Sequence, residues 1–398
     1  MRSFLLKLNK LTDNKKKIFI IGIFILFPII LEDLVKLSYN NFQIFSFGSL
    51  DFWTGINPYT SWNHLSLLGK HLDYFLYSPQ FSILFTPFAI LPSSLGVLCW
   101  NLFTYTLFYF SVFSLPEQFT FVKKKFILLY SIILLLQTLF SEQFNPVVAA
   151  LFLFSFSLLE RNKGFWAVLL ILLSGCTKVY GIFQIGMLLF YPRLWKNILY
   201  SVSLGIIFFL LPLVKIPINE LLDYYHSWMK IVIAHSSDIL RFEIIYRPLY
   251  ILWNPVKSIM EIISLGLLGL LYSIGLFKLK LFKESFAHRV QFLGILMIWA
   301  ILFGIASEYN TYQIAVVGYA LWFLFSQTSK IDKILLWINF ILLEIIPVDI
   351  LCPDKVATLL LDKLNLNTII LLITWILMVY KTFSSNPVSY QLAGDRSG

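Results

Sequence analysis

The chain has 398 residues, of which 59% are hydrophobic and only 13% are charged, and its formal net charge is +10. Soluble domains carry roughly 25% charged residues, and a soluble chain with a mean hydropathy of +0.80 would expose enough apolar surface to aggregate. The composition therefore excludes a soluble protein and predicts a polytopic membrane protein.

The first apolar run, Ile18–Leu34, follows a basic N-terminus at residues 1–17. A secretory signal peptide starts in the same way, but no small-x-small cleavage pattern follows this run. We therefore expect a signal anchor that is retained as the first membrane span.

The rest of the chain contains a series of further apolar runs, several of them short or interrupted by proline. They are Gln80–Leu115, Phe126–Phe140, Pro146–Leu159, Phe165–Leu173 with Val179–Phe190, Ile198–Val214, Ile259–Phe277, Val290–Ala306, Thr311–Phe325, Ile334–Ile346 and Thr368–Tyr380. Because a spanning helix needs roughly 20 apolar residues, the pattern predicts an all-α bundle of about 11–12 spans. We expect one transmembrane domain over residues 18–383, with short helices in its first outer loop.

Two of these runs are irregular. Gln80–Leu115 is too long for one helix and contains Pro87 and Pro92, so it is either a re-entrant half-helix followed by one span, or a stretch that leaves Lys123–Lys125 outside. The run Phe165–Phe190 is interrupted at Lys178. A lysine in hydrocarbon is expensive, so we expect two short helices meeting at an aqueous cavity, where broken backbone is tolerated.

The distribution of Lys and Arg predicts the orientation in the membrane. Most of the 31 basic residues fall in alternate gaps between the apolar runs, and such gaps face the cytoplasm. Residues 1–17 and the polar tail 384–398 then lie in the cytoplasm, and residues 36–79 and 215–255 form outer loops. We expect a cytoplasmic (inner) membrane protein whose active face is extracytoplasmic.

Polar side chains gather on the predicted outer side. The set comprises Asn41, Asp51, Asp73, Tyr77, Glu142, Gln143, Asn145, Lys178, Arg241, Arg247, Glu308 and Tyr312. One interpretation is an outer-leaflet cavity that binds a polar headgroup; the other is ordinary solvated loops. Neither the histidines (His64, His71, His226, His235) nor the cysteines (Cys99, Cys176, Cys352) show metal-ligand spacing, so we expect no metal site.

The order of short motifs resembles a known family. The motifs are Gly55–Tyr59, Tyr77–Pro79, Pro87–Pro92 with Trp100, Glu142–Asn145, the break at Lys178 and Tyr191–Trp195. Together they resemble glycosyltransferase family 87, the α-1,2-mannosyltransferase-like, polyprenyl-phosphate-dependent group of the GT-C superfamily. The similarity runs from about Asn40 to Trp195, with weaker similarity to Tyr319.

The resemblance implies an inverting transfer of a sugar, mannose or a pentose, from a polyprenyl-phosphate donor to an acceptor hydroxyl on a glycolipid, polysaccharide or protein. The lipid-linked sugar is a co-substrate, and no cofactor is implied. A carboxylate would take the proton of the acceptor hydroxyl. Lys178, Arg241 and Arg247 would neutralise the phosphate, and Asn41, Tyr77, Glu142, Gln143, Asn145 and Tyr312 would complete the substrate site.

One departure from the family concerns the general base. The family has an Asp about fourteen residues before the glycine that precedes Pro-Tyr, and counting back from Gly55 leads to Asn41. An amide cannot act as a base. We expect Asp73 to take this role because it precedes the point where the chain re-enters the membrane; Asp51 and Glu308 are the alternatives.

Two other functions fit the sequence. Broken helices with buried charge also occur in transporters, so a transporter or flippase for lipid-linked sugars is one alternative. The amide at Asn41 would suit a non-catalytic protein that only binds such lipids.

Overall fold

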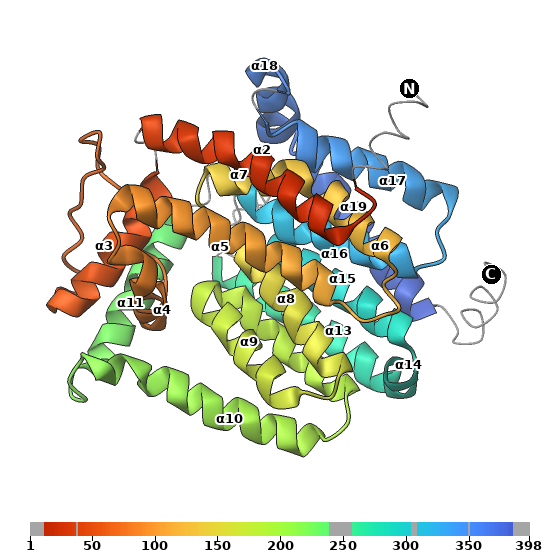
Figure 1. The fold of residues 1–398 in the computed structure, drawn as a ribbon. Coiled ribbons are helices and arrows are strands. Elements are labelled where there is room, and N and C mark those ends of the chain that lie inside the picture. Colours follow the sequence, from red (N-terminus) through yellow and green to blue (C-terminus); the bar gives the residue numbers. More distant parts are fainter. Residues whose placement is uncertain (1–11, 37–38, 239–256, 304–308, 349–350, 385–398) are drawn as a thin grey trace.

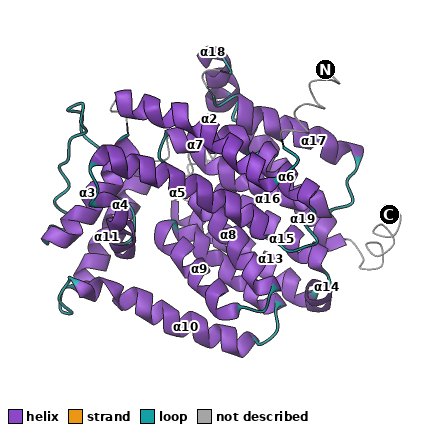
Figure 2. Ribbon diagram, viewed as in Figure 1, coloured by secondary structure: helices purple, strands orange, loops and turns teal. Residues whose placement is uncertain are grey.

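In the computed structural model, described residues are 12–36, 39–238, 257–303, 309–348 and 351–384. Within these ranges every named element is a helix and no named strand occurs (Figure 2). The elements of the first half are α2 (Lys15–Lys36), α3 (Asn40–Thr54), α4 (Pro79–Ala89), α5 (Ser93–Ser114), α6 (Phe121–Tyr130), α7 (Ile132–Phe140), α8 (Asn145–Glu160), α9 (Gly164–Thr177) and the 3₁₀ helix η1 (Val179–Phe190). This confirms the all-α prediction.

The second half continues the bundle. Its elements are α10 (Leu194–Leu210), η2 (Leu211–Val214), α11 (Leu221–Asp238), α13 (Lys257–Phe277), α14 (Leu279–Glu284), α15 (Phe286–Leu302), η4 (Tyr309–Thr311), α16 (Tyr312–Phe325), α17 (Lys330–Phe340), the π-helix η5 (Ile341–Ile345), α18 (Asp354–Ala357), the π-helix η6 (Thr358–Lys363) and α19 (Leu366–Ser384). The sequence predicts a polar outer loop at 215–255. The structure has a helix, α11, within this range, which the sequence analysis does not predict.

Three described segments are long and apolar enough to cross a membrane: α5, α10 with η2, and α19. Shorter apolar helices include α8, α9, η1 and α15. Helix α10 exposes large aliphatic side chains such as Leu199, Val202 and Ile206, which is the surface expected of a helix that faces lipid. The chain is therefore a membrane protein, and the number of about 11–12 spans stays a prediction.

The centre of the bundle is formed by α15 and α16, whose residues are buried almost throughout. A helix that is apolar on all sides is expected in the middle of a bundle. The two backbones approach closely at Gly294 and Gly318: an added Cβ at Gly294 would lie 2.4 Å from the Gly318 carbonyl oxygen. Small residues allow such close helix packing in membranes.

The two irregular runs are divided where the sequence indicated. Gln80–Leu115 forms an 11-residue helix, α4, and a 22-residue helix, α5, and Pro92 lies at the N-cap of α5. The second run divides into α9 and η1 at Lys178, whose own backbone is extended (φ −136°, ψ 118°). The structure therefore confirms both predicted helix breaks.

The bundle has two chemically different ends. Helices α3, α4 and α11 lie at the left end in Figure 1, and α14 lies at the right end. At the right end the Nζ of Lys124 donates to the carbonyl oxygens of Phe113 and Leu115, and Arg161 donates to the carbonyl oxygen of Ser114. Both cations thus cap the C-terminal end of α5, so the lysines at 123–125 lie at the same end as Arg161. Both interpretations of the run Gln80–Leu115 place these two basic segments on one side, because two apolar runs separate them, so the orientation of α4 stays a prediction.

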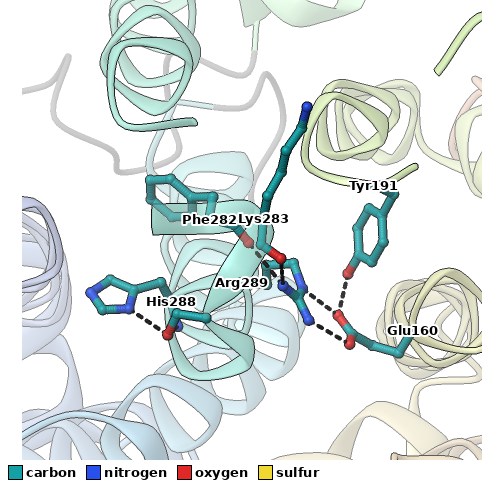
Figure 3. Close-up of polar contacts among 7 residues, drawn as sticks. Glu160, Tyr191, Phe282, Lys283, His288 and Arg289 are labelled. Carbon is teal, nitrogen blue, oxygen red and sulfur yellow. Dashed lines mark hydrogen bonds and ion pairs between the residues drawn. The ribbon is translucent and has the colours of Figure 1, made fainter. Parts of the chain in front are cut away.

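A largely buried ion pair connects the helices at the end of the bundle that carries Lys124 and Arg161 (Figure 3). Arg289 of α15 donates from Nε and one Nη to the two carboxylate oxygens of Glu160, at 2.7 and 2.9 Å. The Tyr191 hydroxyl also donates to Glu160, at 2.6 Å. Arg289 further donates to the carbonyl oxygens of Phe282 and Lys283. The network joins α8, the end of η1, α14 and α15, and no residue of the predicted substrate site belongs to it.

Candidate active site

Helices α8 and α9 form an antiparallel hairpin whose open end carries most of the predicted site. They have 16 and 14 residues and are joined by the short turn at 161–163, so the first residue of α8, Asn145, and the last residue of α9, Thr177, come to the same end. The Ser78 hydroxyl donates to the carbonyl oxygen of Cys176, at 2.7 Å. This bond brings the end of the first outer loop to the end of α9.

Lys178 lies at this open end. Its Nζ is 5.4 Å from the ring centroid of Tyr77, a cation–π geometry that favours a cation beside an aromatic face. Tyr77 is itself held because its carbonyl oxygen accepts the Tyr59 hydroxyl at 2.8 Å, and its ring stacks on Phe81 at 4.3 Å. The half-buried lysine therefore has a defined position at the break between α9 and η1, and the aqueous cavity expected around it stays a prediction.

The turn between α7 and α8 contributes Glu142, Gln143 and Asn145, which are 2%, 7% and 0% exposed. Glu142 has a positive φ of 47°, a left-handed conformation that costs a residue other than glycine about 1–2 kcal/mol. The indole Nε1 of Trp100 donates to the Glu142 carbonyl oxygen at 3.0 Å. A strained residue persists only where its surroundings hold it, so the backbone position of Glu142 is set by the fold.

Asn41 touches the same turn. Its Nδ2 donates to the Ser141 carbonyl oxygen at 2.8 Å, one peptide bond from Glu142. Burial raises the pKa of the neighbouring Tyr39 hydroxyl, and the charge of Glu142 adds to this rise. We refer to Asn41, Tyr77, Glu142 and Lys178 as the hairpin-end cluster, because each lies at the open end of α8 and α9.

The aromatic ring of Phe144 lies within this cluster. Its centroid is 6.3 Å from that of Tyr77, 4.8 Å from that of Trp100 and 6.1 Å from that of Phe45. The rings connect the Glu142 turn to Tyr77 and so to Lys178. The Glu142 turn and Lys178 are thus connected through the rings of Phe144 and Tyr77, and aromatic side chains with a few polar groups are the usual composition of a ligand site.

Asp51 lies elsewhere, near the C-terminal end of α3. It lies ten positions after Asn41 in the same helix, which is about 15 Å at 1.5 Å per residue. Its carboxylate oxygen is 2.7 Å from Nε2 of His64. The His64 ring stacks on Phe47 at 4.5 Å, nearly parallel. Burial raises the pKa of the Tyr224 hydroxyl, and the charge of Asp51 adds to it.

The other predicted residues are not assigned to the hairpin-end cluster. Asp73 is exposed in the segment before Tyr77. Tyr312 is buried, and its hydroxyl contacts Thr368 and the amide of Asn367 in α19, each at 3.2 Å. Arg241, Arg247 and Glu308 lie outside the described residues.

The sequence places His64 among the polar residues of the first outer loop but does not indicate its partner. That partner is Asp51, a carboxylate thirteen residues earlier. The pairing arises because residues 64–72 fold back on themselves, with the Leu72 amide donating to the His64 carbonyl oxygen. Among the described residues no three His, Cys, Asp or Glu side chains gather as a metal site would require.

Comparison with known families gives one match. The model of glycosyltransferase family 87 matches residues 75–327, a range that includes Tyr77, Glu142 and Lys178. Comparison with curated proteins and with solved structures gives no match.

Proposed function

Since the chain belongs to glycosyltransferase family 87 and is thus a glycosyltransferase, we propose that it transfers a sugar from a polyprenyl phosphate to an acceptor hydroxyl at the outer membrane face. The observation that carries this proposal is the position of Lys178, a cation held beside Tyr77 at a break between two apolar helices. A lipid phosphate that enters sideways from the membrane would meet this cation at the end of the hairpin.

In the proposed reaction the acceptor oxygen attacks the anomeric carbon and the bond from that carbon to the phosphate oxygen breaks. The proton of the acceptor passes to a carboxylate, and the polyprenyl phosphate leaves with an added negative charge. A fixed cation near the phosphate lowers the barrier because it stabilises charge that develops as the bond breaks. One displacement inverts the anomeric configuration.

The alternatives from the sequence are less well supported. A transporter would carry its site near the membrane midplane, whereas Glu142 and Lys178 lie at one end of a helix hairpin. A binder without chemistry would need no carboxylate at the end of the hairpin that carries Lys178. We propose mannose or a pentose as the sugar, and the assay below identifies both the sugar and the acceptor.

The test is a donor-consumption assay. Purified protein in nanodiscs is incubated with a panel of polyprenyl-phosphate sugars and a native membrane-lipid extract, and mass spectrometry follows released polyprenyl phosphate and glycosylated products. We expect release from one donor together with a new product. Translocation of a donor across vesicles without bond cleavage would support the transporter instead, and binding of a donor without release would support the non-catalytic binder.

A further inference from the structure

We propose that Glu142 is the general base of this transfer and that Asn41 is the residue that positions it. The inference rests on the proposed function, because a proton acceptor is needed only if a hydroxyl is glycosylated. It departs from our expectation from the sequence, which assigned Glu142 to substrate binding and gave the base to Asp73.

The first argument is location. A base must lie within hydrogen-bond reach of the acceptor hydroxyl, which itself must approach the sugar on the phosphate. Lys178 marks the phosphate end of that arrangement, and Glu142 shares the open end of the α8–α9 hairpin with it. The contact of Phe144 with Tyr77, and of Tyr77 with Lys178, connects the two sides.

The second argument compares the carboxylates of the first outer loop. Asp51 lies about 15 Å along α3 from Asn41 and is engaged by His64 at 2.7 Å. Asp73 is exposed, and four residues of extended chain, up to about 13 Å, separate it from Tyr77. The contacts of Asp51 and the exposed position of Asp73 give no link to Lys178. The Glu142 turn, in contrast, is held at the hairpin-end cluster by hydrogen bonds from Asn41 and Trp100.

The third argument is the way in which Glu142 is held. Trp100 fixes its carbonyl oxygen, and the Asn41 amide fixes the preceding carbonyl, that of Ser141. The left-handed backbone at φ 47° directs the side chain as no relaxed helical residue would. Backbone strain of this kind concentrates at functional sites, and exclusion of water from a buried base limits hydrolysis of the donor.

Asn41 acts through this contact rather than as a base. Its amide cannot accept the proton, but as a donor it orients the turn that carries the carboxylate. An aspartate at the same position would direct a carboxylate oxygen at the Ser141 carbonyl oxygen, and the two acceptors would repel each other. The asparagine is therefore the residue type that suits a base on the neighbouring turn.

The experiment measures turnover, donor affinity and the pH profile of polyprenyl-phosphate release in nanodiscs, using polyprenyl-phosphate mannose or the panel donor that the wild type consumes. We expect Glu142→Gln to lower turnover by about 10²- to 10⁴-fold, the usual contribution of a general base, with the donor dissociation constant unchanged. Glu142→Asp should retain measurable turnover because it keeps a carboxylate. The matched control is Glu220→Gln, the same chemical change at an exposed outer position, which should behave as the wild type.

The outcomes separate this inference from the proposed function. If the wild type releases no polyprenyl phosphate from any donor, the proposed function fails and the assignment of Glu142 falls with it. If the wild type is active and Glu142→Gln keeps full turnover while Asp73→Asn loses it, only the assignment is wrong and the base lies in the first outer loop. If Glu142→Gln does not fold, the test is the acid limb of the pH profile of turnover. This limb should shift between the wild type and Glu142→Asp. An unshifted limb would overturn the inference.

Discussion

Lys178 is the residue at which sequence and structure agree most directly. A charged side chain between two apolar runs is expensive in lipid, and the fold gives it a half-buried place at a helix end, beside the face of Tyr77. The sequence could indicate this because the cost is local: the break, the charge and the apolar flanks are all contiguous. The aromatic partner, a hundred residues earlier, could not be identified from the sequence.

We expect Lys178→Ala to raise the donor KM by about 10- to 100-fold, since a hydrogen bond to a charged group contributes about 1.5–3 kcal/mol. Turnover at saturating donor should fall less. The measurement is the donor dependence of polyprenyl-phosphate release, with Lys70→Ala, an exposed lysine of the first outer loop, as the control. An unchanged KM together with an unchanged turnover for Lys178→Ala would show that the lysine has a structural role only.

The pair formed by Asp51 and His64 shows what a local pattern cannot reveal. The two residues meet only because the loop after α3 folds back, and nothing in their spacing indicates it. The same limit applied to Glu142: the sequence marked it as an unusual carboxylate in a short turn, but its neighbour Asn41 is supplied by an element a hundred residues away.

We expect Asp51→Ala to lower the free energy of unfolding by about 1–3 kcal/mol, because it leaves the partly buried His64 without its acceptor. In our assignment the carboxylate has no part in the chemistry, so the folded fraction should keep its turnover. Thermal unfolding in detergent, combined with the release assay at low temperature, tests both statements. Loss of turnover at unchanged stability would return Asp51 to the list of possible bases.

At the scale of helices, apolar runs located most elements because lipid and core both select for them. The runs Pro146–Leu159 and Thr311–Phe325 match α8 and α16 to within a residue or two. Helix α11 was missed because it carries many polar and charged residues, and a search for apolar runs passes over such a helix. The 3₁₀ geometry of η1 likewise has no signal in hydrophobic pattern alone.

The Glu160–Arg289 pair makes an element-scale prediction. We expect Glu160→Ala to lower the free energy of unfolding by about 3–5 kcal/mol, because it leaves a buried guanidinium unpaired. The double variant Glu160→Leu/Arg289→Met should be less destabilised than the single one, since it removes both charges and keeps the volume. Thermal unfolding of the three proteins tests this; equal losses in both variants would contradict a charge-based explanation.

The close packing of α15 against α16 leads to a second prediction at the scale of helices. We expect Gly294→Ala to destabilise the protein by about 1–3 kcal/mol through overpacking, because its Cβ would lie 2.4 Å from a backbone oxygen. Gly205→Ala in α10 is the matched control, since its added Cβ has nothing within 4 Å. The control should be neutral or slightly stabilised, given the preference of helices for alanine. Equal melting temperatures for the two variants would mean that α15 and α16 do not pack this closely.

At the scale of the whole molecule, the fold places basic residues and the hairpin-end cluster at opposite ends of the bundle. The charge pattern of the sequence had assigned these two sets to opposite sides of the membrane. Lys124 and Arg161 meet at the end of α5, and the Glu160–Arg289 pair joins the adjacent helices. The hairpin-end cluster lies at the opposite end of α8 and α9. Basic residues mark the cytoplasmic side of a membrane protein, so this separation fits the proposed transfer at the outer face, and the sidedness itself can be tested.

We expect the hairpin-end cluster to face the outside of the cell. In a variant whose native cysteines are replaced by alanine, Ser61→Cys should react with a membrane-impermeant maleimide in intact cells, and Lys163→Cys should react only after permeabilisation. Both positions are exposed, so access to the reagent depends on the side of the membrane. Ser61 belongs to the first outer loop and Lys163 to the turn beside Arg161. The reverse pattern would place the cluster in the cytoplasm, where the donor would have to be a cytoplasmic one. In intact cells, a reaction at Ser61→Cys without one at Lys163→Cys would place the hairpin-end cluster on the outer side, where the proposed donor is expected.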